Sequence, residues 1–194
     1  MPKACFYLNN SLANSINEHV DISVARCYQC GKCSAGCPIV EFMDYSPSLV
    51  LRYLQTELPE NDDAVLRSKT IWYCLSCEMC IARCPMEVDI PVIMDFLRIE
   101  SIRLRKTHKE VKNIIRFHKA FLNTIKRNGR LHEMGLVLDY KTRSLDLLQD
   151  LALSPGMFKR GKLRILPEQV KNRKEIKHIF TIGSNKRKNK SIKN

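Results

Sequence analysis

Eight of the nine cysteines fall into two runs with the same spacing. Each run reads C-x2-C-x2-C-x3-C-P, and we call them the first motif (residues 27–38) and the second motif (residues 74–85). Thiolates at this spacing ligate [4Fe–4S] cubes. The three closely spaced cysteines wrap one cube, and in proteins with two clusters the fourth cysteine ligates the other cube.

The crossed pattern assigns four cysteines to each cluster. We expect the first cluster to be bound by Cys27, Cys30, Cys33 and Cys84, and the second cluster by Cys74, Cys77, Cys80 and Cys37. All eight irons would then carry a cysteine ligand, which leaves no open iron for a substrate. The cysteine pattern therefore predicts an electron-transfer protein that has no catalytic residue of its own.

Two other uses of cysteine fit this pattern less well. Structural zinc takes four ligands in two separated pairs, so it does not need the third closely spaced cysteine of each motif. Disulfides suit oxidising compartments. The residues after Met1 lack the apolar core of a secretory signal, which predicts a cytoplasmic location.

The net charge of +13 is unevenly distributed. Residues 1–100 carry 8 Lys and Arg against 13 Asp and Glu, whereas residues 101–194 carry 25 against 7. A basic region suits nucleic acid, an anionic membrane or an acidic protein partner. No apolar run approaches the roughly 18 residues that a membrane span requires.

Local patterns predict a mainly α fold. Ser46 and Pro47 are expected to begin a helix that Leu58-Pro59 ends, Asn61 to Asp63 to begin a second, and Asp89 to cap a third. Further helices are expected at residues 111–129, 144–153 and 167–180. Alternating Val20, Ile22 and Val24 indicate a short extended segment, and residues 183–194 are expected to be disordered when alone. On the third helix, one apolar stripe is expected at Ile90, Ile93, Met94, Leu97 and Leu104 and another at Val92, Phe96 and Ile99.

Charged residues inside the motifs suggest different reduction potentials. Lys32 and Arg83 adjoin ligands of the first cluster, and Glu78 lies inside the second motif. A unit charge about 6 Å away at an effective dielectric of ~20 is worth roughly 3 kcal/mol. We predict the higher potential for the first cluster, so that electrons run from the second cluster to the first.

The remaining candidates are assigned structural roles. Cys5 belongs to neither motif and is expected to be an inert thiol, and Trp72 is expected to be a core aromatic. The five histidines do not form a metal or nucleophile pattern, and the chain has no Gly-rich nucleotide loop.

Three sequence runs outside the cysteine motifs narrow the choice of protein family. Residues 117–121 (FHKAF), Gly129-Arg130 with Glu133, and residues 159–163 (KRGKL) resemble the iron–sulfur C subunit of the CoB–CoM heterodisulfide reductase of methanogenic archaea. The resemblance covers roughly residues 20–180. It implies an α-helical ferredoxin domain with two [4Fe–4S] clusters, at residues 20–105, and a basic helical extension for partner docking at residues 106–194.

The resemblance also implies a place in a complex. The C subunit relays electrons from the flavin-containing, electron-bifurcating A subunit to the B subunit, whose CCG motifs serve reduction of the CoM-S-S-CoB heterodisulfide. Hydrogenase or formate dehydrogenase belongs to the larger complex. Two alternatives stay open, namely the relay subunit of a succinate/fumarate, glycolate or glycerol-3-phosphate oxidoreductase and, more remotely, an iron–sulfur protein that binds nucleic acid. The latter is disfavoured because only Phe158 and Phe180 supply aromatic rings after residue 140.

Overall fold

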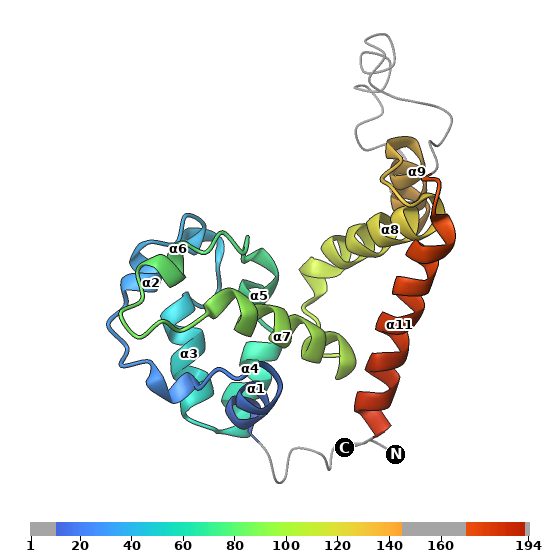
Figure 1. Ribbon diagram of the computed structural model, residues 1–194. Helices are drawn as coiled ribbons and strands as arrows, with labels where there is room; N and C mark the ends of the chain where they lie inside the picture. Colours follow the sequence, from blue (N-terminus) through green and yellow to red (C-terminus); the bar gives the residue numbers. More distant parts are fainter. Residues whose placement is uncertain (1–10, 145–169, 193–194) are drawn as a thin grey trace. The chain divides into compact units, whose positions relative to one another are not determined.

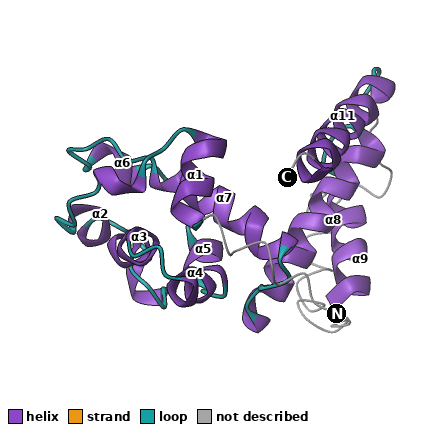
Figure 2. Cartoon of the chain, turned by 90° about the horizontal axis from the view of Figure 1, so that it is seen from below, coloured by secondary structure: helices purple, strands orange, loops and turns teal. Residues whose placement is uncertain are grey.

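The computed structural model describes residues 11–144 and 170–192, and within these ranges the regular structure is entirely helical (Figure 2). The mainly α fold expected from the sequence is confirmed. The chain divides into two compact units, residues 1–112 and residues 113–194.

The first unit is built from short helices around one longer helix. Its elements are α1 (Leu12–Val20), η2 (Val24–Arg26), α2 (Lys32–Ala35), η3 (Val40–Phe42), α3 (Pro47–Gln55), α4 (Pro59–Leu66), α5 (Thr70–Tyr73), α6 (Met79–Ala82), α7 (Ile90–Arg103) and η4 (Lys109–Val111). Helix α7 packs against α1, α4 and α5, and α2 lies beside α6 (Figure 1).

Helix α7 supplies the centre of the core. Asp89 caps it by accepting a hydrogen bond from the Val92 backbone N–H, as expected. Its fully buried residues are Ile90, Ile93, Met94 and Leu97. They share the apolar core with buried residues of α1, α4 and α5, and α3 joins this core through α1 and α4; these residues include Leu12, Ile16, Leu51, Leu54, Leu66 and Ile71. Of the second expected stripe only Phe96 is buried, whereas Ile99 is 51% exposed. Trp72 is buried, as predicted.

Three expectations for this unit were wrong. The segment expected to be extended, residues 20–24, is not a strand: α1 ends at Val20, where Asp21 adopts a left-handed conformation (φ 57°), and η2 begins at Val24. Helix α4 begins at Pro59 rather than near Asn61, since proline fits the first helical turn. Leu104 is only partly buried.

The second unit contains three described helices: α8 (Lys112–Asn128), α9 (Glu133–Ser144) and α11 (Arg173–Ile192). Gly129 ends α8 with φ 83° and donates its N–H to the Ile125 carbonyl at 2.7 Å, as the sequence predicted. The expectation of disorder after residue 183 was wrong, because α11 continues to Ile192.

Several expectations lie outside the described residues. These are the role of Cys5, the helix expected beyond Ser144 and the run at 159–163. None of the helices that the structure describes is both long and apolar enough to cross a membrane.

Candidate iron–sulfur cluster sites

The two cysteine motifs have the same backbone conformation. Gln29 and Ser76 occupy equivalent positions and are both left-handed, with φ 63° and 51°. Gly31 and Glu78 are likewise equivalent and left-handed, with φ 75° and 62°, and each precedes a one-turn helix, α2 or α6. Alternating left- and right-handed residues turn successive backbone N–H groups into one concavity, a geometry found at many Fe–S sites. Each loop is therefore shaped to receive an anionic cluster.

The second site is a cavity that joins both motifs. Its lining includes Cys37 from the first motif together with Cys74, Cys77 and Cys80 from the second. Apolar side chains complete the wall, namely Ile39, Met43, Pro47, Leu75, Met79, Ile90, Pro91 and Met94. The structure thus brings together the four cysteines expected at the second cluster, including the one supplied by the other motif.

At the first site, Cys27, Cys30 and Cys84, three of the four ligands expected from the sequence, lie near the Tyr28 hydroxyl. A hydrogen bond with Cys30, followed by burial and the nearby Cys30, Cys84 and Cys27 sulfurs, raises the pKa of the Tyr28 hydroxyl. Cys33 is buried, and Cys84 Sγ accepts a hydrogen bond from the Val88 backbone N–H at 3.4 Å. Cys84 of the second motif therefore lies near cysteines of the first.

The donor chemistry fits iron–sulfur clusters. The eight described cysteines form no disulfide. Among the described residues, no three His, Cys, Asp or Glu side chains gather closely enough to hold one metal ion. Burial, followed by the nearby Cys74 sulfur, raises the pKa of the Cys80 thiol to about 11. This thiol needs a bound cation to ionise at neutral pH, and coordination to iron supplies one.

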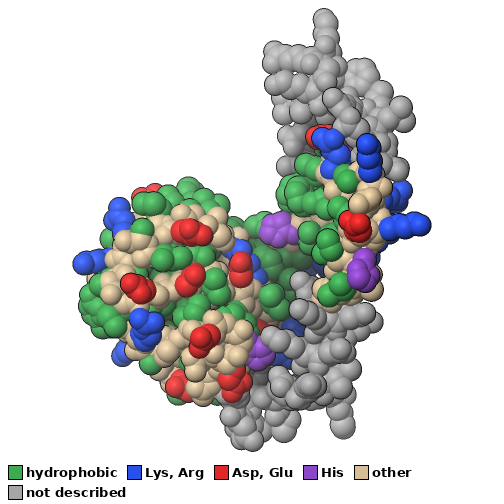
Figure 3. All heavy atoms as spheres, in the orientation of Figure 1, with side chains coloured by type: hydrophobic (Ala, Val, Ile, Leu, Met, Phe, Trp, Pro, Cys, Tyr) green, Lys and Arg blue, Asp and Glu red, His purple; other side chains and the backbone are tan. Residues whose placement is uncertain are grey.

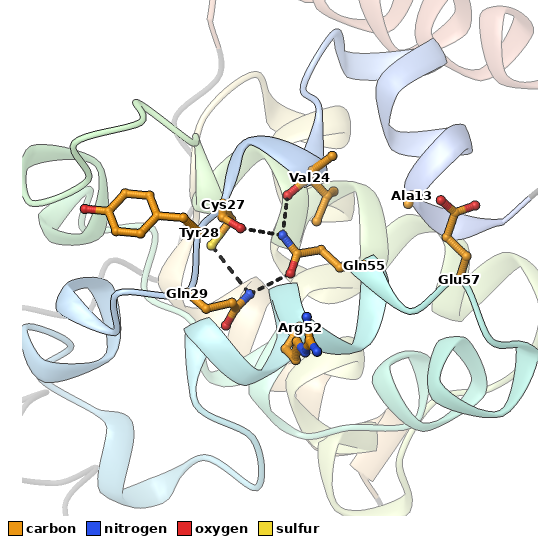
Figure 4. Close-up of a pocket in the computed structure, with 9 residues that line it drawn as sticks. Ala13, Val24, Cys27, Tyr28, Gln29, Arg52, Gln55 and Glu57 are labelled. Atoms are coloured by element: carbon orange, nitrogen blue, oxygen red, sulfur yellow. Dashed lines mark hydrogen bonds between the residues drawn. The ribbon is translucent and has the colours of Figure 1, made fainter.

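A glutamine at the end of α3 holds the start of the first motif. Gln55 Nε2 donates to the Val24 carbonyl at 3.0 Å and to the Cys27 carbonyl at 2.6 Å (Figure 4). Gln29 Nε2 donates to Gln55 Oε1 at 3.0 Å and to Cys27 Sγ at 3.5 Å. The loop is thereby fixed to α3, and one sulfur receives an amide N–H.

An arginine on α7 takes the same place in the second motif. The half-buried Arg98 guanidinium donates to the carbonyls of Ile71 and Cys74, which correspond to Val24 and Cys27 in the first motif. Arg98 also pairs with Asp95 at 2.8 Å. A cation thus contacts the second motif, which the prediction of cluster potentials did not include.

Arg83 lies against the first motif, as its sequence position suggested. A Cβ atom added to Gly36 would come within 2.4 Å of Arg83 Cδ, so the arginine side chain crosses directly over this glycine. Lys32 and Glu78 are exposed, and water screens their charges.

Sequence reasoning missed Gln29, Gln55 and Arg98 as part of the sites. Gln29 was visible inside the first motif, but its role depends on a contact with a residue 26 positions away. Arg98 follows the buried Leu97 on α7, and no spacing rule links it to Cys74. Only the tertiary packing identifies these side chains.

Comparison with known proteins identifies the class of this region. Residues 23–88 match the 4Fe-4S dicluster domain family, and this domain holds the eight motif cysteines. The first unit therefore carries an α-helical domain for [4Fe–4S] clusters, and an iron–sulfur electron-transfer role follows from it.

The curated relatives are subunits of one kind of reductase. The chain is 37% identical over 106 residues to the C subunit of the Ferredoxin:CoB-CoM heterodisulfide reductase of Methanosarcina acetivorans, covering 53% of this chain and 41% of that protein. It is 40% identical over 83 residues to the second iron-sulfur C subunit of the CoB--CoM heterodisulfide reductase of Methanocaldococcus jannaschii (43% and 42%). It is 33% identical over 90 residues to the C2 subunit of the H(2)/formate:CoB-CoM heterodisulfide,ferredoxin reductase of Methanococcus maripaludis (45% and 47%).

These matches confirm the resemblance to the heterodisulfide reductase C subunit that the sequence suggested. In each case the chain spans less than half the length of the relative it matches.

Proposed function

We propose that this chain is the electron-relaying subunit of a cytoplasmic heterodisulfide reductase. In this role, electrons pass through its two [4Fe–4S] clusters from a flavin-containing, bifurcating A subunit to the B subunit, which reduces the CoM-S-S-CoB heterodisulfide. The relatives' names support the reductase, and the dicluster domain supports the relay. A hydrogenase or a formate dehydrogenase would belong to the larger complex and supply its electrons.

The observation that carries the proposal is the cavity in which Cys37 meets Cys74, Cys77 and Cys80. Crossed ligation gives each of two cubes four cysteines, so no iron remains open for a substrate. The residues of this chain then have three tasks: to hold the clusters, to shield them with apolar walls and to set their potentials.

We further propose that residues 106–194 dock partner subunits, while residues 20–105 bind the clusters. Support comes from α8, whose basic side chains lie on one side and apolar side chains on the other. Within the described residues this apolar side is incompletely covered, since Phe117 is 42% and Leu122 is 51% exposed. On the face shown in Figure 3, Lys and Arg side chains project from the described part of this unit.

Anaerobic purification with iron and sulfide analysis tests the cluster assignment. About eight irons per chain and two reducible EPR signals are expected. Zinc, or far fewer irons, would exclude it.

Co-purification with the A and B subunits tests the relay. Heterodisulfide reduction by the assembled complex should require this chain, and Cys77→Ser should slow electron delivery to the B subunit without preventing assembly. Full reduction in the absence of this chain would contradict the relay.

A further inference from the structure

The amide orientations around Cys27 are determined by their partners. Gln55 Nε2 faces two backbone carbonyls, those of Val24 and Cys27, which can only accept hydrogen bonds. Its other terminal atom is therefore Oε1, which accepts from Gln29. Gln29 must in turn present its NH2 group, because an oxygen facing Gln55 Oε1 would leave two acceptors in contact. The second N–H of this group is then available to Cys27 Sγ at 3.5 Å (Figure 4).

The backbone adds a second constraint on this side chain. Gln29 is held in the left-handed region, which a residue with a long side chain adopts only when its surroundings impose it. Gln55 donates to two carbonyls of the chain that leads into the loop, those of Val24 and Cys27, and its Oε1 accepts from the Gln29 amide. The position of the Gln29 amide is thus set by α3 and not by Gln29 alone.

The second motif has equivalent hydrogen bonds to its two carbonyls but lacks the amide that contacts a cysteine sulfur. Arg98 donates to the two equivalent carbonyls, yet a guanidinium has no acceptor atom that could hold a neighbouring amide. The residue equivalent to Gln29 is Ser76, which is also left-handed but has no side-chain amide. The amide-to-sulfur hydrogen bond is therefore a feature of the first motif.

We propose that Gln55 acts as a positioning residue that aims the Gln29 amide at Cys27 Sγ and thereby raises the reduction potential of the first cluster alone. The inference rests on the proposed ligation of that cluster by Cys27. One-electron reduction adds negative charge to the cluster and its sulfurs, and an N–H donor stabilises that charge. Hydrogen bonds to ligand sulfurs are among the factors that set cluster potentials.

The test is an EPR-monitored redox titration of the full chain with its clusters bound. Gln29→Asn retains an amide and tolerates the left-handed backbone, but it withdraws the amide by one methylene. We expect the oxidised-to-reduced ratio of the first cluster to rise roughly three- to tenfold at fixed potential, a downward shift of about 28–59 mV for one electron. The second cluster should not move.

Gln55→Leu tests the positioning role. It should shift the first cluster in the same direction, and the Gln29→Asn/Gln55→Leu double variant should add little to the single shifts, because both changes remove one interaction. If Gln55→Leu does not retain its iron, Gln29→Asn alone decides, since it leaves the bonds from Gln55 to Val24 and Cys27 in place.

Ser76→Gln is the matched control in the second motif. It places the same amide on an equivalent backbone where Arg98 cannot hold it, so we expect no change in the second cluster. Lys32→Gln identifies which titration wave belongs to the first cluster.

The outcomes separate this inference from the ligand assignment. An iron content far below about eight in the unsubstituted chain would overturn the ligand assignment. Full iron content with an unchanged first wave in Gln29→Asn, or equal shifts of both waves, would overturn the inference alone. An upward shift of the second wave in Ser76→Gln would refute the positioning role of Gln55.

Discussion

At the scale of single residues, Asp62 is an unusual buried carboxylate. It is 2% exposed, its Oδ2 accepts a hydrogen bond from the Leu12 backbone N–H at 3.0 Å, and its Oδ1 has no partner. Burial raises the pKa of this carboxyl, and the hydrogen bond from Leu12 only partly opposes it. The folded protein therefore holds the Asp62 proton more tightly than the unfolded chain does.

This carboxyl predicts a pH-dependent contribution to stability. Between the unfolded-state pKa of about 3.9 and the raised folded-state value, the native state binds more protons, so the contribution of Asp62 to the free energy of unfolding falls as pH rises. We expect Asp62→Asn to remove this pH-dependent contribution to the free energy of unfolding. The melting temperature of the unsubstituted protein minus that of the variant should decrease as the pH rises from about 4 and become constant once the pH exceeds the raised pKa of Asp62. A difference that does not decrease at any point above about pH 4 would contradict the raised pKa.

Glu78 gives a second prediction at this scale. Its carboxylate lies between Cys77 and Cys80, and Glu78→Gln removes one negative charge from the second motif. Solvent screening reduces the Coulomb effect several-fold because Glu78 is exposed, so we expect an upward shift of tens of millivolts in the second cluster. The measurement is an EPR-monitored titration with Glu87→Gln as the charge-matched control. An unchanged second wave would remove Glu78 from the factors that order the two potentials.

The structure adds a competing charge to that order. The positive charge of Arg98 contacts the second motif and opposes the negative charge of Glu78. Because Asp95 on the same helix pairs with Arg98, this opposition is only partial. The higher potential of the first cluster therefore stays a prediction, to which the Gln29–Gln55 pair gives support independent of charge.

At the scale of elements, α8 offers a paired test of docking. Leu122 is an exposed residue on its apolar side, whereas Lys119 lies on the basic side. Leu122→Gln and Lys119→Gln introduce the same side chain into the same helix, with similar effects on helix propensity. We expect Leu122→Gln to weaken co-purification with the A and B subunits about tenfold, since burial of a leucine contributes roughly 1.5–3 kcal/mol.

Lys119→Gln should weaken the association less, and less still as salt is raised. Iron content should be unchanged in both variants. Equal losses at all salt concentrations would argue against an apolar contact at Leu122.

Local chemistry explains which elements were predictable. Ser46 with Pro47, and Asp89 with Val92, involve neighbours in sequence, so their helix starts were predicted correctly. Pro59 was read as the end of one helix although it begins the next, because both readings satisfy its fixed φ.

Helix α1 was missed for a different reason. Its buried residues Leu12 and Ile16 stand one helical turn apart, but only two such residues are present. Helix α9 was missed because none of its residues is fully buried, so its sequence carries little apolar periodicity. The hydrogen bonds of Gln55 and Arg98 depend on packing between distant segments, which no local pattern encodes.

At the scale of the whole molecule, the first unit combines a helical core with two cysteine-bearing loops. The core formed by α1, α3, α4 and α7 is apolar and closely packed, whereas the loops rely on cysteine side chains. Removal of iron by an anaerobic chelator should therefore leave the core folded and loosen both motifs.

Hydrogen exchange measured by mass spectrometry tests this division. Protection should fall in residues 27–38 and 74–88 and persist in α3 and α7. Refilling with iron and sulfide should restore it. Loss of protection throughout the first unit would mean that the clusters, and not the apolar core, hold the fold.

The meeting of Cys37 with Cys74, Cys77 and Cys80 also has a consequence for biogenesis. When only the first loop of a nascent chain has emerged from the ribosome, the first cluster still lacks Cys84. The second cluster then lacks three of its four proposed ligands, Cys74, Cys77 and Cys80. Under the proposed crossed ligation, neither cube can be completed until the second loop has emerged, so we expect no cluster insertion before that point. A halted fragment that ends before residue 74 should therefore bind no complete cube.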